Sequence, residues 1–144
     1  MKRNALAAVW LAVLCGCNAT SLEAPSDLAT FPASAVRVID GDTYEAQSER
    51  IRLIGWDTPE TGKHAKCEQE AKWGKLATAK ARQIIQGAET VGFQVEGRDR
   101  CNRALAHVAI NGPASLGELL QVEGMAQRWT YPRERKPQWC GSGD

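Results

Sequence analysis

The stretch from Val36 to Glu60, VRVIDGDTYEAQSERIRLIGWDTPE, decides how this chain folds. Its apolar residues have the spacing of two or three short strands, separated by an Asp-Gly-Asp turn at residues 40–42 and a polar turn at residues 46–50. Gly41 allows the chain to turn sharply. The same stretch carries a concentration of charge, contributed by Asp40, Asp42, Arg52, Asp57 and Glu60.

Beyond this stretch, residues 68–86 have the pattern of an amphipathic helix. Two acids lie in its first turn and Gly87 follows its end, as the polarity of a helix favours. The residues expected on its inward face are Trp73, Ala77, Ala81, Ile84 and Ile85.

The second half of the chain predicts two more strands and a short helix. The segment from Val91 to Val95 alternates, residues 97–102 form a polar turn, and a strand over 103–110 ends at Asn-Gly. Ser115 is the expected cap of a helix over 116–124. We therefore predict an α+β fold, mainly β, built as a five-stranded, partly open barrel with two helices. A sandwich is disfavoured because there are too few strands.

The first 34 residues are expected to lie outside that domain. Lys2 and Arg3 precede a short apolar run, which is the layout of a secretory signal over residues 1–17. The sequence LCGC, ending at Cys17, resembles a lipobox, although Cys15 departs from it; ordinary cleavage nearby is the alternative to lipidation at Cys17. Residues 18–34 are expected to be a flexible tether, and 35–144 the folded domain. The protein is thus expected to be exported, either periplasmic or extracellular, with membrane attachment if Cys17 is lipidated.

The overall charge does not identify a partner. The 144 residues carry a formal net charge of +1, and removal of residues 1–16 leaves 16 basic against 17 acidic residues. Binding to nucleic acid would therefore need a local basic patch. The segment from Arg98 to Arg103 is a candidate for such a patch.

Three cysteines, Cys67, Cys101 and Cys140, lie outside the signal. An oxidising compartment would allow one disulfide and one free thiol, and the residues alone do not choose among the three pairings. A zinc site at His64 and Cys67 is disfavoured because His107 is the only other histidine and no CxxC motif is present.

The acids of the opening stretch suit a hard cation. Carboxylates without histidine or thiolate partners favour Ca²⁺ or Mg²⁺ over zinc, although DGDT alone is more simply a hairpin turn. Arg52 lies among apolar neighbours and requires a partner, which is either a carboxylate in a structural ion pair or a bound phosphate. With Arg103 it would complete the requirements of phosphodiester hydrolysis, namely an activated water and stabilisation of negative charge.

Four segments in collinear order carry a resemblance to the staphylococcal nuclease family. They are DGDT (40–43), IRLIGWDTPE (51–60), WGKLATAKARQII (73–85) and GRDRCNRALAHV (97–108). The resemblance implies an OB-fold and a Ca²⁺-dependent nuclease that hydrolyses DNA and RNA to leave 3′-phosphate ends.

The resemblance also implies roles for individual residues. Asp42, Asp57 and the Thr58 carbonyl correspond to metal ligands, and Asp40 to an outer acid. Arg52 and Arg103 correspond to the pair that grips the scissile phosphate, and Glu60 to the proposed general base. Further substrate contacts are expected from Arg100, Trp129 and Tyr131, although the family's tyrosine pair is not matched in register and Cys101-Asn102 replaces its Tyr-Gly.

Similarity to exported relatives implies a disulfide between Cys67 and Cys140, leaving Cys101 free. Two other functions remain as alternatives. A non-catalytic OB-fold module binding single strands would be expected to have lost catalytic residues, and none is lost. A lipid-anchored structural protein would be expected to bind no metal.

Overall fold

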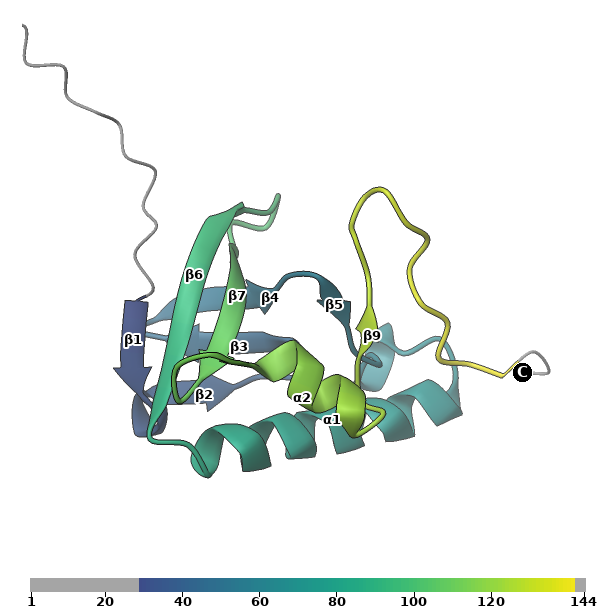
Figure 1. The fold of residues 1–144 in the computed structure, drawn as a ribbon. Coiled ribbons are helices and arrows are strands. Elements are labelled where there is room, and N and C mark those ends of the chain that lie inside the picture. Colours follow the sequence, from purple (N-terminus) through teal and green to yellow (C-terminus); the bar gives the residue numbers. More distant parts are fainter. Residues whose placement is uncertain (1–28, 142–144) are drawn as a thin grey trace, which may run out of the picture.

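The computed structural model describes residues 29–141. The expected signal at 1–17, including Cys17, and the tether up to residue 28 lie outside the described residues. The described chain forms a strongly curled sheet, with one long helix beneath it and a short helix beside it (Figure 1). No helix within residues 29–141 is long and apolar enough to cross a membrane.

The sheet has the strand order β1-β6-β7-β4-β3-β2, with β8 added against β7, and a separate two-stranded ribbon pairs β5 with β9. Its strands are β1 (Ala29–Pro32), β2 (Val36–Val38), β3 (Thr43–Ala46), β4 (Glu49–Leu53), β6 (Thr90–Arg98), β7 (Ala104–Ile110) and β8 (Ala114–Ser115); the ribbon consists of β5 (Trp56–Asp57) and β9 (Gln127–Arg128). The predicted α+β class and partly open barrel are confirmed, and the barrel takes the form of a curled half-barrel sheet with two helices. The five expected strands correspond to β2, β3, β4, β6 and β7.

Both predicted helices are present. Helix α1 (Glu68–Gln86) begins after Cys67, whose Sγ accepts a hydrogen bond from the backbone N–H of Glu70, and it ends at Gly87. Helix α2 (Leu116–Val122) is capped by the hydroxyl of Ser115, as predicted. Two 3-10 turns, η1 (Ala33–Ala35) and η2 (Gly62–His64), complete the structure.

The pairing of β4 with β7 connects the two halves of the chain. It is parallel and places Arg52 opposite Leu105, whereas the other strand pairs are antiparallel. Gln47 and Ser48 both adopt positive φ in the β3–β4 hairpin, which is the conformation that joins two strands through a two-residue turn. The start of β7, which directly follows Arg103, is thereby placed beside the part of β4 that carries Arg52.

The core lies between the sheet and the helices. Its largest fully buried side chains include Tyr44, Phe93, Ile85, Leu116 and Leu120. From α1, Ala77, Ala81 and Ile85 face this core as expected, but Trp73 does not follow them fully and remains 36% exposed. The helix therefore meets the sheet mainly through small side chains near its middle, which permits a close approach.

The predicted tether, residues 18–34, includes residues that the structure places in the sheet. Ala29–Pro32 pair with β6 from Thr90 to Phe93, and the Phe31 ring lies 5.9 Å from that of Phe93. Short apolar residues in this Pro-containing segment gave no periodic signal, because a four-residue edge strand is too short to establish one. The folded domain thus includes residues 29–34.

Candidate active site

A hydrogen bond from Tyr44 stabilises the Asp-Gly-Asp turn. The buried Tyr44 hydroxyl donates to the carbonyl of Gly41 at 2.6 Å, and the backbone N–H of Asp42 donates to Oδ1 of Asp40 at 3.1 Å. Burial, reinforced by the charge of Asp40, raises the pKa of Tyr44 far above its ordinary value, so the phenol stays a hydrogen-bond donor. A Cβ on Gly41 would lie 2.8 Å from Cβ of Thr58, so only glycine allows this turn to pack so closely.

Arg52 occupies the centre of the acid cluster. One guanidinium nitrogen forms an ion pair with Oδ1 of Asp42, and Nη2 lies 3.7 Å from Oδ1 of Asp57. The backbone N–H of Thr58 donates to Oδ2 of Asp42 at 3.2 Å, so the end of β5 is fastened to the turn. Burial lowers the pKa of Arg52, partly offset by Asp57. Asp42, Arg52, Asp57 and Thr58 therefore form one buried cluster.

Asp57 is the most deeply buried acid of this cluster, with no exposed side-chain surface. Its Oδ2 accepts a hydrogen bond from the indole Nε1 of Trp139 at 2.8 Å. Its Oδ1 has only the longer charge contacts, to Arg52 and to Nζ of Lys136 at 3.4 Å, and forms no well-defined hydrogen bond. Burial raises the pKa of Asp57, and Trp139, Lys136 and Arg52 oppose that rise.

Glu60 lies at the edge of the cluster and is paired with Lys136. Nζ of Lys136 lies 2.5 Å from Oε1 of Glu60. Burial alone would lower the pKa of Lys136, but its hydrogen bond to Glu60 and the charge of Asp57 outweigh that effect and raise it. The ammonium group is therefore firmly charged and bridges two carboxylates.

Helix α1 supports the backbone around Glu60. The buried carboxylate of Glu70 accepts hydrogen bonds from the backbone N–H groups of Glu60, at 3.3 Å, and Lys66, at 2.7 Å. Gly74 faces the same turn, where a Cβ would overlap the carbonyl oxygen of Glu60 and lie 2.9 Å from that of Pro59. The first two turns of α1 thus fix the position of the DTPE segment.

Arg103 approaches from the other half of the chain. It directly precedes β7, and its charge contributes to lowering the pKa of Arg52, so the two guanidinium groups lie within electrostatic reach. Its Nε donates to Oδ2 of Asp99 at 2.7 Å. Because an arginine has five N–H donors, the terminal nitrogens remain available for a phosphate.

The remaining predicted substrate contacts lie farther out. Arg100 is exposed in the β6–β7 turn, and Tyr131 is 66% exposed with its ring 5.4 Å from that of Trp129. Trp129 is linked to the cluster through Lys136, whose Nζ lies 6.0 Å from its ring centroid. The structure therefore joins Trp129 to the acid cluster and leaves Arg100 and Tyr131 on the surface.

The disulfide between Cys67 and Cys140 is present, and Cys101 is free and exposed. This pairing agrees with the expectation and removes Cys67 from any zinc site. Both histidines are exposed.

The donors at the cluster fit a hard cation. Among residues 29–141 no group of three or more His, Cys, Asp or Glu side chains is close enough to hold a metal ion. Two carboxylates, Asp42 and Asp57, do meet at the end of β5, and Asp57 Oδ1 is a buried oxygen without a hydrogen bond. A Ca²⁺ ion completes its shell with backbone carbonyls and water, so two carboxylates and the Thr58 carbonyl are a suitable donor set.

Sequence reasoning missed four residues that contact the site or its supports, namely Glu70, Asp99, Lys136 and Trp139. The expected disulfide could have indicated the positions of Lys136 and Trp139. Joining Cys140 to Cys67 brings the residues before Cys140 near the segment that follows Asp57. Lys136 and Trp139 could have been placed near the acids on that ground.

The curled mixed sheet and its cluster of acids and arginines define a nuclease-like OB-fold protein. A family model described as "Staphylococcal nuclease homologue" matches residues 50–139. The chain belongs to the staphylococcal nuclease family.

Similar proteins include a "Thermonuclease" of Staphylococcus intermedius, 36% identical over 105 residues, covering 69% of this chain and 61% of the relative. A "Thermonuclease" of Staphylococcus hyicus is 33% identical, covering 67% and 58%. "Endonuclease YncB" of Bacillus subtilis (strain 168) is 33% identical, covering 63% and 44%. The chain thus spans less than two thirds of the length of these relatives.

Proposed function

We propose that this protein is a Ca²⁺-dependent nuclease that hydrolyses DNA and RNA and leaves 3′-phosphate ends. The observation that carries the proposal is the buried cluster of Asp42, Arg52 and Asp57, with Glu60 at its edge and Arg103 within electrostatic reach. The names of the thermonuclease relatives support the same class of activity.

Asp42, Asp57 and the Thr58 carbonyl would hold the Ca²⁺ ion. When bound, the ion would supply positive charge beside the scissile phosphate.

Glu60 would accept the proton of the attacking water. The water oxygen then forms a bond to phosphorus while the bond from phosphorus to the 5′-oxygen breaks, and a proton passes to that oxygen from solvent. The phosphate therefore stays on the 3′ side. The negative charge that builds on its non-bridging oxygens would be stabilised by Arg52 and Arg103, whose planar guanidinium groups fit two oxygens at once.

Export, either to the periplasm or outside the cell, is part of this proposal. The disulfide between Cys67 and Cys140 supports it, because such bonds persist in oxidising compartments. Attachment to a membrane through a lipidated Cys17 is a further proposal resting on LCGC alone.

The direct test is incubation of the purified protein with DNA and RNA in the presence of Ca²⁺, Mg²⁺ or EDTA, followed by analysis of the ends. We expect cleavage with Ca²⁺, 3′-phosphate products and no cleavage with EDTA. Binding of single strands without cleavage would favour the non-catalytic module instead.

A second arm uses Arg103→Ala. Because Arg103 would act mainly in the transition state, turnover should fall by roughly 10² to 10³ while the melting temperature changes little. Arg37→Ala, which removes an exposed arginine paired with Glu45 on another strand, is the matched control and should retain activity. An equal loss of stability and activity in Arg103→Ala would indicate a structural ion pair.

A further inference from the structure

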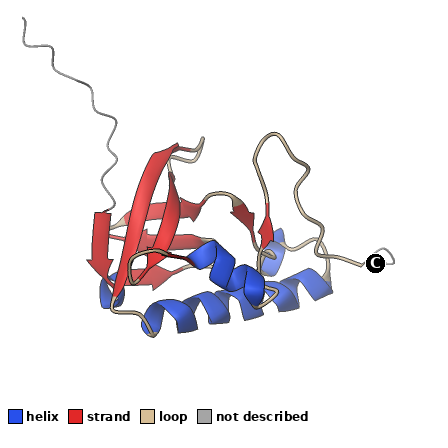
Figure 2. Ribbon diagram, viewed as in Figure 1, coloured by secondary structure: helices blue, strands red, loops and turns tan. Residues whose placement is uncertain are grey.

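The chain after β9 folds back across the candidate site. Residues 129–140, here called the C-terminal segment, contain no helix or strand and run as a long loop beyond β9 (Figure 2). The segment is fastened at both ends. The N–H of Trp129 donates to the carbonyl of Gly55 at 3.1 Å, and Cys140 is bonded to Cys67.

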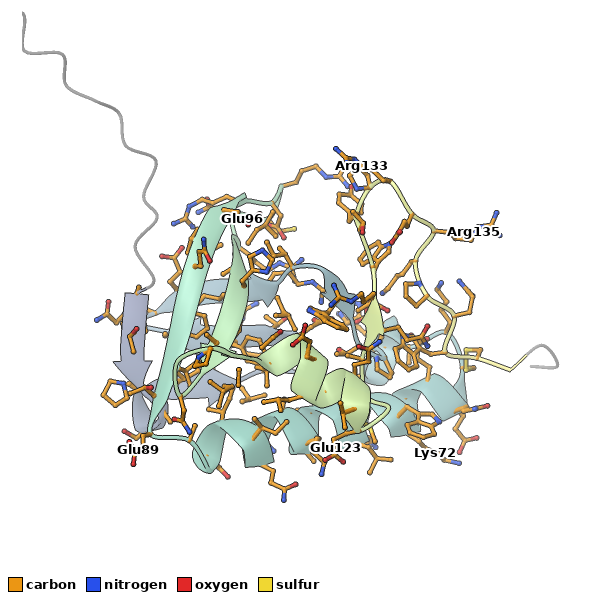
Figure 3. The ribbon with its side chains drawn as sticks, in the orientation of Figure 1. Lys72, Glu89, Glu96, Glu123, Arg133 and Arg135 are labelled. Atoms are coloured by element: carbon orange, nitrogen blue, oxygen red, sulfur yellow. A yellow bond between two sulfur atoms is a disulfide. The ribbon has the colours of Figure 1, made fainter. Side chains whose placement is uncertain are left out.

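The outer part of this segment is held by its own hydrogen bonds. The backbone N–H of Thr130 donates to Oε2 of Glu134 at 2.7 Å, and the indole of Trp129 donates to the carbonyl of Glu134 at 3.1 Å. Arg133 lies at the outer tip of the loop and Arg135 points outward from it (Figure 3), and both are exposed. The loop is therefore held by its own hydrogen bonds, and the two neighbouring arginines lie on its surface.

Lys136 has the opposite orientation. Its Nζ lies 2.5 Å from Oε1 of Glu60 and 3.4 Å from Oδ1 of Asp57, and Trp139 donates to the other oxygen of Asp57. The ammonium group is thus in contact with the orphaned oxygen of Asp57 and with the candidate base. A divalent cation on Asp57 would repel an ammonium group at this distance, particularly in a partly buried site.

We propose that Lys136 is a built-in cation that competes with the divalent metal ion for Asp57 and stays paired with Glu60 until the metal binds, with the C-terminal segment acting as the lid that delivers it. The inference rests on the proposed function, because it concerns the same metal site. Binding of the metal displaces Lys136 from both carboxylates and frees Glu60.

The competition has a thermodynamic consequence. When the Lys136-bound state must open before metal binds, the apparent dissociation constant is the intrinsic one divided by the open fraction. A closed state favoured about tenfold therefore weakens apparent binding about tenfold. The disulfide strengthens the closed state, because it keeps the segment near the acids and raises the effective concentration of the ammonium group.

The test is calorimetric titration of Ca²⁺ into the purified protein without nucleic acid. Lys136→Gln removes the charge, so we expect its dissociation constant for Ca²⁺ to be about threefold to tenfold lower than that of the wild type. Lys136→Arg keeps a cation in the segment and should remain close to the wild type.

Arg135→Gln is the matched control, since it removes one positive charge from the adjacent exposed residue. It should leave the dissociation constant nearly unchanged. If Arg135→Gln and Lys136→Gln lowered the dissociation constant for Ca²⁺ equally, the effect would arise from net charge alone, and the proposal would be overturned.

A second variant, Cys140→Ser, frees the end of the segment and keeps Cys67 at the start of α1. It should also bind Ca²⁺ more tightly, measured at a temperature where circular dichroism shows the variant folded.

Unchanged or weaker binding in Lys136→Gln overturns the inference while leaving the metal site intact. Absence of Ca²⁺ binding in every variant would overturn the metal site of the proposed function as well.

Discussion

Oε1 of Glu70 accepts a hydrogen bond from the backbone N–H of Glu60 at 3.3 Å, across 10 residues of chain. Its second oxygen accepts from Lys66, and the side chain is buried. One carboxylate thus closes the loop between the DTPE segment and α1. The position of the candidate base depends on an acid that belongs to the helix.

The first prediction concerns Glu70→Gln. Glutamine keeps one acceptor oxygen and replaces the other by an NH₂ donor, so one of the two backbone N–H groups loses its partner. We expect a loss of about 1–3 kcal/mol in the free energy of unfolding, measured by urea denaturation. Glu68→Gln is the control, because Glu68 is exposed and forms only an i,i+4 pair with Lys72 on the outer face of α1 (Figure 3). Similar losses in both variants would contradict the role assigned to Glu70.

These two glutamates illustrate what a sequence can predict. Helix α1 was placed correctly, because its periodicity and terminal residues are local signals. Both acids fitted the first turn of a helix equally well, and only the tertiary arrangement distinguishes the buried one. Short edge strands such as β1 were not predicted for the same reason, since their existence depends on a partner strand far along the chain.

The second prediction concerns Gly74→Ala. The added methyl group would overlap the carbonyl of Glu60, which is backbone and cannot rotate away. We expect the DTPE segment to shift, with a stability loss of about 1–3 kcal/mol and a marked fall in turnover. Measurement of thermal unfolding and nuclease activity on the same samples tests this. Gly97→Ala is the control, because a Cβ there meets no atom within 4 Å.

The third prediction concerns the pH dependence that Asp99 contributes. Although partial burial opposes it, hydrogen bonds from Arg103 and from the backbone lower the pKa of Asp99 below its ordinary value of 3.8. Its stabilisation is therefore present above that value and is lost as the pH falls through the lower folded-state pKa. The difference in melting temperature between wild type and Asp99→Asn should be largest near neutral pH and should shrink below pH 3.8.

Asp99→Asn should also reduce turnover near neutral pH, because the Arg103 guanidinium loses the carboxylate that orients it. Glu96→Gln is the control. Glu96 lies on the same hairpin, at the upper end of the sheet, and pairs with His107 on the surface (Figure 3). A difference in melting temperature for Asp99→Asn that stays constant down to pH 2 would contradict the assignment.

The fourth prediction concerns the metal carboxylates. A ligand that binds only the folded state stabilises it, so Ca²⁺ should raise the melting temperature of the wild type. Asp42→Ala should abolish this shift, whatever its own melting temperature without metal. Glu45→Ala removes an acid on β3 outside the cluster and should keep the shift. An equal shift in wild type and Asp42→Ala would place the ion elsewhere.

Most residues of the candidate site lie in the four sequence segments that resemble the nuclease family in collinear order. Asp42 and Arg52 meet because β3 and β4 form a hairpin, which is a local structure, and Asp57 follows Arg52 by only five residues, in β5. Arg103 joins them through the parallel pairing of β4 with β7, which depends on the whole barrel. The position of Lys136 is harder still to predict from the sequence, because the C-terminal segment has no periodicity and is positioned by a disulfide.

The fifth prediction concerns that disulfide. It links residues 73 positions apart, and in the chain-entropy model a closed loop of this size contributes about 4 kcal/mol. Cys140→Ser should therefore lower the midpoint of urea unfolding strongly, whereas Cys101→Ser, which removes a free exposed thiol, should not. Addition of a reductant should bring the wild type close to Cys140→Ser and leave Cys140→Ser unaffected. If the reductant destabilised both proteins equally, its effect would have to arise from somewhere other than the Cys67–Cys140 bond.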